Sequence, residues 1–135
     1  MVVTSAATVA SVCGGQILAG DPGAIAVAAV IDSRDVSSGC VFFAMAGERC
    51  DGHDFVGAAV TSGARIVVVS RGDEAVLSAF SKAGRRDSAL VLVDETARAL
   101  SALAAHVRLR LTCPVVAVTG SSGKTTTKDL SLIHI

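Results

Sequence analysis

The chain alternates between short apolar runs and segments in which apolar residues recur every three or four positions. Short runs rich in β-branched residues are typical of strands, and the longer spacing is typical of helices. The predicted strands span residues 16–19, 24–31, 40–46, 66–69, 90–93 and 115–118. The predicted helices span residues 6–13, 55–62, 73–83 and 95–111. Because strands that alternate with helices favour parallel pairing, the sequence predicts an α/β fold.

Capping residues mark the ends of these helices. Thr4 or Ser5 can accept hydrogen bonds at the start of the first helix, and Asp94 can do so at the start of the last. A glycine follows each of the first three helices and can end it. In the last helix the expected buried stripe is Ala97, Leu100, Leu103, Ala104, Val107 and Leu111. The residues expected in solvent are Arg98, His106, Arg108 and Arg110.

The composition indicates one folded domain. The chain has 135 residues, of which 51% are hydrophobic, and a mean hydropathy of +0.61. Its formal net charge is zero and 3% of its residues are aromatic, which disfavours nucleic acid as a partner. The longest apolar run is too short to span a bilayer, and residues 1–14 lack a secretory pattern, so we expect a cytoplasmic protein. The four cysteines lack metal-ligand spacing and are interpreted as reduced thiols.

The strongest chemical signal lies in residues 115–127, where an apolar run leads into a glycine turn and a Lys-Thr pair. Gly120 and Gly123 allow backbone N–H groups to point at an anion, and the following helix adds its positive end. Lys124 can neutralise β- and γ-phosphates, and the Thr125 hydroxyl can bind Mg²⁺. The predicted nucleotide-binding residues are Thr119, Gly120, Ser121, Ser122, Gly123, Lys124, Thr125 and Thr126.

This loop departs from the common G-x-x-x-x-G-K-[ST] pattern, because Val118 stands where the first glycine is expected. It matches a shorter G-x-x-G-K-T form. The structural alternative is a glycine–serine turn that happens to precede a lysine. The order of strand, turn, lysine, hydroxyl and helix favours phosphate binding over that alternative.

Two polar loops, residues 32–39 and 47–54, follow predicted strands. On residue types alone, Asp32 or Ser33 can cap the next element of a polar turn. His53 in the second loop can likewise be a turn residue whose hydrogen bonds are satisfied within the chain. These interpretations remain open beside a role in binding.

The polar loops and the phosphate loop together resemble the Mur ligases of peptidoglycan synthesis. The matching segments are Asp-Ser-Arg at 32–34, Gly-Cys-Val-Phe-Phe-Ala at 39–44, Gly-Glu-Arg-Cys-Asp-Gly-His-Asp-Phe at 47–55, and Thr-Gly-Ser-Ser-Gly-Lys-Thr-Thr-Thr-Lys-Asp at 119–129. Ser121, Ser122 and Lys128 resemble the members that join D-Ala-D-Ala to UDP-N-acetylmuramoyl-tripeptide. Members that add the third stem residue usually have Thr-Asn before Gly-Lys-Thr and are the nearest alternative.

The resemblance implies an ATP-dependent ligase with Mg²⁺, in which Lys124 and Thr125 are catalytic and Thr125 binds the metal. In the family, ATP phosphorylates the substrate's terminal carboxylate, and the incoming amine attacks the acyl phosphate. The partners implied are UDP-N-acetylmuramoyl-tripeptide and D-Ala-D-Ala. The residues that the resemblance places around the UDP moiety are Asp32, Ser33, Arg34, Glu48, Arg49, Asp51, Gly52, His53 and Asp54.

The resemblance also implies a domain organisation. Family members have one domain for the UDP moiety, one for ATP and one for the incoming amino acid or dipeptide. We expect residues 1–111 to form the first and residues 112–129 to open the second, with 130–135 a non-native tail that departs from the family pattern. The chain is therefore expected to be an N-terminal fragment, monomeric and inactive by itself.

Two other function classes remain as alternatives. A nucleotide-sugar binding module without catalysis would explain a folded region ahead of the phosphate loop. An unrelated kinase or GTPase is disfavoured, because those proteins usually carry the loop near their N-terminus, whereas here it begins at Thr119.

Overall fold

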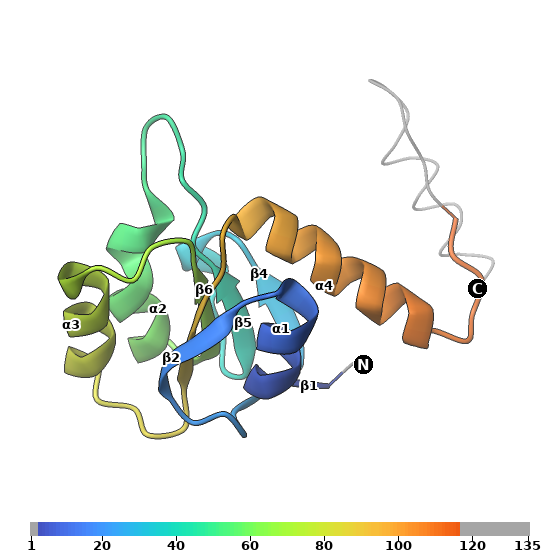
Figure 1. Ribbon diagram of the computed structural model, residues 1–135, viewed down its shortest axis with the longest axis horizontal. Coiled ribbons are helices and arrows are strands. Elements are labelled where there is room, and N and C mark those ends of the chain that lie inside the picture. Colours follow the sequence, from blue (N-terminus) through green and yellow to red (C-terminus); the bar gives the residue numbers. More distant parts are fainter. Residues whose placement is uncertain (1–2, 117–135) are drawn as a thin grey trace.

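The structure, a computed structural model, describes residues 3–116. A five-stranded sheet forms its middle layer, and a pair of helices covers each face (Figure 1). The strands of this sheet are β2 (Gln16–Gly20), β4 (Ala28–Val30), β5 (Cys40–Phe43), β6 (Ala64–Val69) and β7 (Ala89–Leu92). The helices are α1 (Ala6–Cys13), α2 (Val56–Thr61), α3 (Glu74–Lys82) and α4 (Thr96–Arg110).

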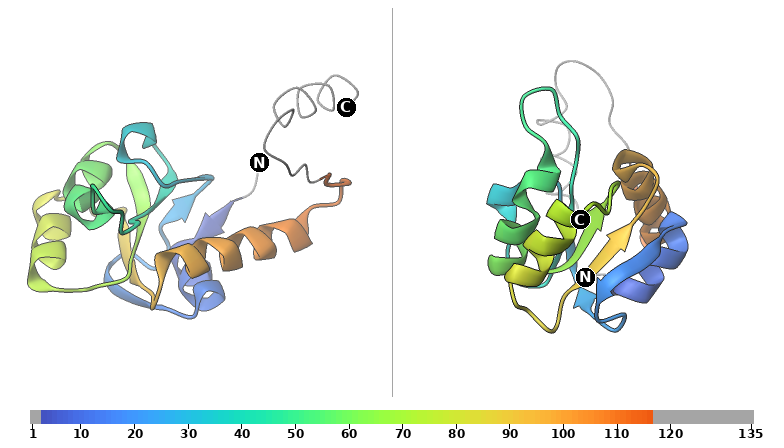
Figure 2. Two further views of the ribbon diagram at one scale, coloured as in Figure 1. Left: turned by 90° about the horizontal axis from the view of Figure 1, so that it is seen from above. Right: turned by 60° about the vertical axis from the view of Figure 1, so that its left-hand side comes forward.

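Shorter elements complete the described part of the chain. The strands β1 (Thr4–Ser5) and β3 (Ile25–Ala26) pair antiparallel in a small separate sheet. Two single-turn 3-10 helices, η1 (Ser33–Asp35) and η2 (Gly52–Phe55), follow β4 and β5 respectively. Figure 2 shows α1 and α4 on one face of the main sheet and α2 and α3 on the other.

The strand order is β2-β7-β6-β5-β4, with parallel pairing from β4 to β7. The predicted α/β fold is therefore confirmed. The expectation of parallel pairing fails only for β2 in this sheet, which runs antiparallel to β7. β2 is an edge strand, and the chain leaves it for β3 and for β4 at the other edge of the sheet, so no helical crossover joins β2 directly to β7 and requires the two to be parallel.

Both faces of the sheet are buried. Along β5, Val41 and Phe43 pack in the core beneath α1 and α4, whereas Cys40 and Phe42 pack in the core beneath α2 and α3. The residues of β6 alternate in the same way. Parallel strands covered on both faces consist of nearly continuous apolar residues, which is why the sequence indicated these two strands clearly.

The predicted strand at residues 24–31 is divided in the structure. Its first part forms β3 in the small sheet, and its second part forms β4 beside β5. Val27 lies between the two, and its N–H donates to the carbonyl of Gly39 (2.8 Å). The run of apolar residues thus indicated extended chain correctly but not a change of sheet, since that change is made by pairing with distant segments.

The first helix begins and ends as predicted. The Ser5 hydroxyl accepts the N–H of Thr8 (3.2 Å), and Gly14 ends α1 with φ 68°. The predicted start of α4 is wrong by one residue, because Glu95 rather than Asp94 precedes the helix and makes no side-chain cap. The N–H of Val93 still donates to the carbonyl of Val69 (2.8 Å), as in the sheet, and the helix begins only after this extended segment.

The buried face of α4 also differs from the expected stripe. Thr96, Ala99 and Leu103 are buried, whereas Ala97 and Ala104 are exposed. Ala99 and Leu103 belong to the core that α4 shares with α1 and one face of the sheet, so packing against both determines the buried face of α4. Of the four residues predicted to lie in solvent, Arg98, Arg108 and Arg110 are exposed, whereas His106 is half-buried.

The segment after α4 does not follow the prediction of a buried strand as far as the structure describes it. Val115 and Val116 are exposed at 49% and 76% and belong to no strand. No strand of residues 3–116 pairs with them. Residues 117 and 118 lie outside the described part.

Among the described residues, no helix is both long enough and apolar enough to cross a bilayer.

Candidate functional site

A cavity of about 600 Å³ lies where β4 and β5 end. The turn after β4 lines one side of it, and the loop after β5 lines the other. Its lining residues are Ile31, Asp32, Ser33, Arg34, Phe42, Met45, Gly47, Cys50, Gly52 and Phe55. Ligands of open parallel sheets usually bind at the carboxyl ends of the strands, and this volume is typical of a small-molecule site.

The turn after β4 is held by its own aspartate. Asp32 Oδ1 accepts the N–H of Arg34 (2.9 Å), which starts η1, and Asp32 Oδ2 accepts from Arg34 Nη2 (2.7 Å). These hydrogen bonds lower the pKa of Asp32 to about 2. The Arg34 side chain is 87% exposed, so its guanidinium is oriented at the mouth of the cavity without being buried.

The loop after β5 folds back on itself in a hairpin-like arrangement and extends from the end of the strand in Figure 1. Gly47 donates its N–H to the carbonyl of Cys50 (2.9 Å), and Gly52 donates to the carbonyl of Met45 (2.7 Å). The Met45 sulfur in turn accepts from the Thr96 hydroxyl (3.4 Å) at the start of α4. The base of the loop is therefore fixed, whereas Glu48 and the rest of its tip are exposed.

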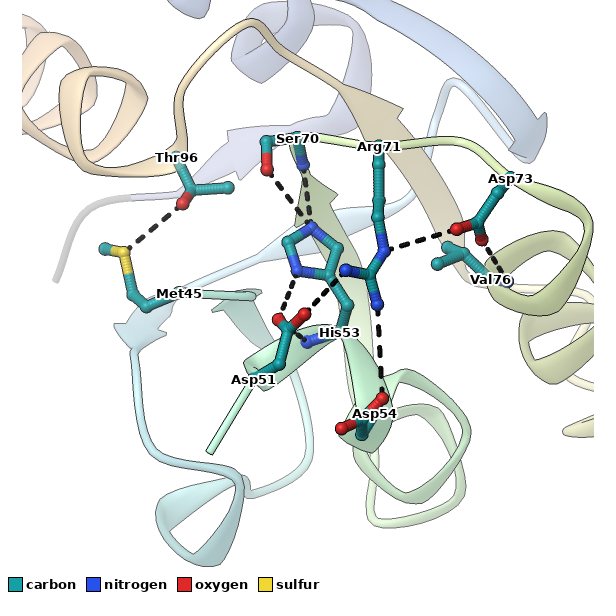
Figure 3. Close-up of polar contacts among 9 residues, drawn as sticks. All are labelled: Met45, Asp51, His53, Asp54, Ser70, Arg71, Asp73, Val76 and Thr96. Atoms are coloured by element: carbon teal, nitrogen blue, oxygen red, sulfur yellow. Dashed lines mark hydrogen bonds and ion pairs between the residues drawn. The ribbon is translucent and has the colours of Figure 1, made fainter. Parts of the chain in front are cut away.

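His53 joins this loop to the end of β6 (Figure 3). Its Nδ1 lies 2.7 Å from Asp51 Oδ1, and its Nε2 accepts the backbone N–H of Ser70 (3.0 Å). Because Nε2 is an acceptor here, the ring proton lies on Nδ1 and is donated to Asp51. The side chain is 2% exposed. Both ring nitrogens are thus used within the chain, and a hydrogen bond from this ring to a ligand would require one of these bonds to break.

The order Asp51, His53 and Ser70 resembles the relay of a serine hydrolase, but the geometry excludes that chemistry. The Ser70 hydroxyl is 3.3 Å from Nε2, farther than the Ser70 backbone N–H that already occupies the nitrogen's single lone pair. A general base needs that lone pair free to take the hydroxyl proton. We therefore interpret the three residues as a structural connection.

Arg71 lies beside Asp51 on the solvent side of this connection. Its Nη1 donates to Asp51 Oδ2 (2.6 Å), its Nε lies 3.3 Å from Asp73 Oδ2, and its Nη2 lies 4.0 Å from Asp54 Oδ1 (Figure 3). Hydrogen bonds from the His53 amide and ring, and from Arg71, lower the pKa of Asp51 to about 2. Since this pKa is depressed by folding, the stabilisation is present above about pH 4 and is lost as the pH falls toward 2.

The predicted substrate-side residues fall into three groups in the structure. Asp32, Ser33, Arg34 and Gly52 line the cavity; Asp51, His53 and Asp54 form or adjoin the network beside it; Glu48 and Arg49 are exposed in the loop. The predicted nucleotide-binding residues, 119–126, lie outside the described residues. Within residues 3–116, no group of three or more His, Cys, Asp or Glu side chains is arranged to hold a metal ion.

Several residues of the site were not predicted. Ile31, Phe42 and Phe55 provide apolar walls, and Ser70 and Arg71 hold the network. A signal for the last two was present, because they directly follow the buried strand β6 just as Asp32 follows β4. Residues that follow parallel strands meet at the same end of a sheet, and this rule predicts Ser70 and Arg71 beside Asp32.

A second, apolar cavity of about 250 Å³ lies between α4 and the strands β4 and β5. Its lining residues are Thr4, Val27, Ala28, Ala29, Val41, Leu100, Leu103, Ala104 and Val107. It contains no charged side chain. It therefore lacks a group that would orient an anionic ligand, unlike the cavity beside Arg34.

A family model described as "Mur ligase family, catalytic domain" matches residues 28–108 of this chain. Among curated relatives, the UDP-N-acetylmuramoyl-tripeptide–D-alanyl-D-alanine ligase of Synechocystis sp. is 41% identical over 99 residues, which cover 73% of this chain and 20% of the relative. The UDP-N-acetylmuramoyl-L-alanyl-D-glutamate–2,6-diaminopimelate ligase of Geobacillus kaustophilus is 40% identical over 106 residues, covering 77% and 19%. The chain thus spans about a fifth of the length of these relatives.

Solved structures give the same similarity. MurF from Acinetobacter baumannii superposes with a TM-score of 0.72 and 31% identity, over 96% of this chain and 27% of that one. MurF ligase from Thermotoga maritima in complex with ADP gives a TM-score of 0.54 and 35% identity, over 76% and 21%. Both structures are therefore similar to this chain in sequence as well as in fold.

Proposed function

Because this chain belongs to the Mur ligase family, we propose that it is part of an ATP-dependent ligase that joins D-Ala-D-Ala to UDP-N-acetylmuramoyl-tripeptide in peptidoglycan synthesis. Within it, residues 1–111 form the domain that holds the UDP moiety of the substrate. Residues 112–129 open the ATP-binding domain, and residues 130–135 are a non-native tail. The chain is expected to be cytoplasmic and monomeric, and by itself to lack ligase activity.

One observation carries this proposal: the two polar loops that resemble the family's substrate motifs border a single cavity. Arg34 uses Nε and Nη2 to bind Asp32, so the donors that it presents to a diphosphate are the remaining N–H groups, which include those on Nη1, and Ser33 adds a hydroxyl on the same turn. Phe42 and Phe55 provide an apolar surface for a base. This combination of cationic donor, hydroxyl and apolar wall supports a uridine diphosphate group as the ligand.

The ligation step is assigned to the phosphate loop on the strength of its sequence. Lys124 and the backbone N–H groups of 120–123 would stabilise charge on the γ-phosphate, and Thr125 would bind Mg²⁺. MgATP would supply the phosphoryl group that activates the substrate's carboxylate as an acyl phosphate, with ADP as the leaving group. The amine of D-Ala-D-Ala then attacks the acyl carbon, and the peptide bond forms as phosphate leaves. The ADP complex of the Thermotoga maritima ligase supports a nucleotide in the related protein.

The choice of D-Ala-D-Ala as the incoming group rests on relatives and on the loop sequence. The Synechocystis relative and the Acinetobacter baumannii MurF structure favour it. Ser121 and Ser122 favour it over the Thr-Asn form. The diaminopimelate-adding relative from Geobacillus kaustophilus represents the second candidate, with a similar identity.

Arg34→Ala is expected to weaken binding of UDP-N-acetylmuramoyl-tripeptide about ten- to a hundredfold, because a charge-assisted hydrogen bond contributes about 1.5–3 kcal/mol. Isothermal titration of the 135-residue chain measures this. Arg98→Ala is the matched control, since Arg98 is also a highly exposed arginine (80%) near one carboxylate but lies on α4. No binding by the unaltered chain would contradict the proposed function, and equal affinity of the Arg34 variant would remove Arg34 from the site.

A further inference from the structure

Arg71 lies outside every sequence motif, yet it connects three acidic residues around the substrate loop. It follows β6 and reaches back to Asp51, twenty positions earlier in the chain. It also approaches Asp54 in η2 and Asp73. Asp73 in turn caps α3 by accepting the N–H of Val76 (3.0 Å). One guanidinium thus joins the loop, the end of β6 and the start of α3.

The contact with Asp51 links Arg71 to His53. Asp51 uses Oδ1 for the amide and ring of His53 and Oδ2 for Arg71. With both oxygens held, the carboxylate has little freedom to rotate. Because His53 depends on that carboxylate for its orientation, Arg71 acts on the ring and on the Ser70 contact through Asp51.

The loop has few other restraints. Residues 46–50 are exposed, so apolar burial contributes little to holding them over the cavity. The restraints on it are the hydrogen bond from Gly47 to Cys50 within the loop and four contacts at its base. These four are the antiparallel bridge between Ala46 and Asp51, the hydrogen bond from Gly52 to Met45, the contact of Met45 with Thr96, and the connection through Asp51. Gly47, Cys50 and Gly52 from this segment line the cavity, so the position of the loop decides the shape of one wall.

We propose that Arg71 is a positioning residue for the substrate cavity: by holding Asp51, it keeps the loop of residues 47–55 in the conformation that binds the uridine nucleotide. This inference rests on the proposed function of the cavity. Arg71 touches no substrate in this role. Its removal lowers the population of the binding-competent loop, and the apparent Kd rises by the same factor.

The test is titration of the 135-residue chain and its variants with UDP, at a temperature well below the melting point of each. Arg71→Ala is expected to raise the Kd about tenfold, the factor that corresponds to about 1.4 kcal/mol lost from a charge-assisted hydrogen bond. Arg71→Lys is expected to recover part of the affinity, since a lysine keeps the charge but cannot bond two carboxylates in a fork. Arg85→Ala is the matched control, because Arg85 is also half-exposed and paired with an aspartate, Asp87, but precedes β7 at the opposite edge of the sheet.

Hydrogen exchange separates positioning from a general loss of stability. In Arg71→Ala the amides of Gly47 and Gly52 should exchange faster, while those of Ala44 and Val93, which bond to β6 carbonyls, should not change. UDP binding equal to that of the unaltered chain, or equal acceleration at all four amides, would overturn the inference and leave the proposed function standing. Absence of UDP binding in the unaltered chain would instead contradict the proposed function itself and the inference with it.

Discussion

His53→Ala is expected to abolish measurable binding of UDP-N-acetylmuramoyl-tripeptide and to lower the free energy of unfolding by about 3 kcal/mol. The substitution leaves the buried N–H of Ser70 without its acceptor and removes the ring donor to Asp51 Oδ1, which then accepts only from the backbone N–H of residue 53. It also leaves a cavity at a side chain that is 2% exposed. The loop would then lose the contact between His53 and Ser70 and would be joined to the end of β6 only through Arg71 and Asp51, so one wall of the substrate cavity would lose its fixed position.

His106→Ala is the matched control for this effect. His106 lies on α4, is half-buried, and makes no contact with the substrate loop among the described hydrogen bonds. Titration calorimetry and urea unfolding of both variants measure binding and stability separately. If His53→Ala bound the substrate as tightly as His106→Ala does, the interpretation of His53 as the connection between loop and sheet would be wrong.

Lys124→Ala is expected to reduce ATP-dependent ligation by the full-length ligase about a hundred- to a thousandfold, the usual loss when one preorganised charge-stabilising group is removed. The lysine provides positive charge where the γ-phosphoryl group is transferred. Binding of UDP-N-acetylmuramoyl-tripeptide should not change, because the substrate cavity is formed by other residues. Initial rates with saturating D-Ala-D-Ala, followed by phosphate release, measure the effect.

Lys82→Ala serves as the control for that prediction, since Lys82 is an exposed residue in the last turn of α3. A Lys124→Ala enzyme with full ligation activity would remove the phosphate loop from the mechanism. A variant that lost substrate binding together with activity would indicate instead that Lys124 supports the fold.

Local patterns in the sequence predicted much of the fold. The apolar runs that became β5 and β6 are buried on both faces, so their hydrophobic residues identify them without knowledge of their partners. Ser5 and Gly14 act within one helical turn, so the sequence predicted their places at the two ends of α1. The antiparallel β2, the division of 24–31 and the buried face of α4 depend on distant contacts, which no local pattern contains.

The candidate site shows the same difference between local and distant information. The polar loops at 32–34 and 47–55 were found from their resemblance to family motifs, and the structure places both at one cavity. Residue types alone also left open that His53 is satisfied within the chain, and its two hydrogen bonds agree with that alternative. Arg71 carries no motif, and its role depends on contacts with Asp51 that only the fold brings about.

An NMR titration of the ¹⁵N-labelled chain with UDP reports directly where the nucleotide binds. We expect the amide signals of Ser33, Arg34, Gly47 and Gly52 to shift together and to saturate with one Kd. Shifts confined to Leu100, Leu103 and Val107 would place the ligand in the apolar cavity beside α4 instead. That result, or the absence of any saturable shift, would contradict the assignment of a uridine nucleotide to the carboxyl ends of β4 and β5.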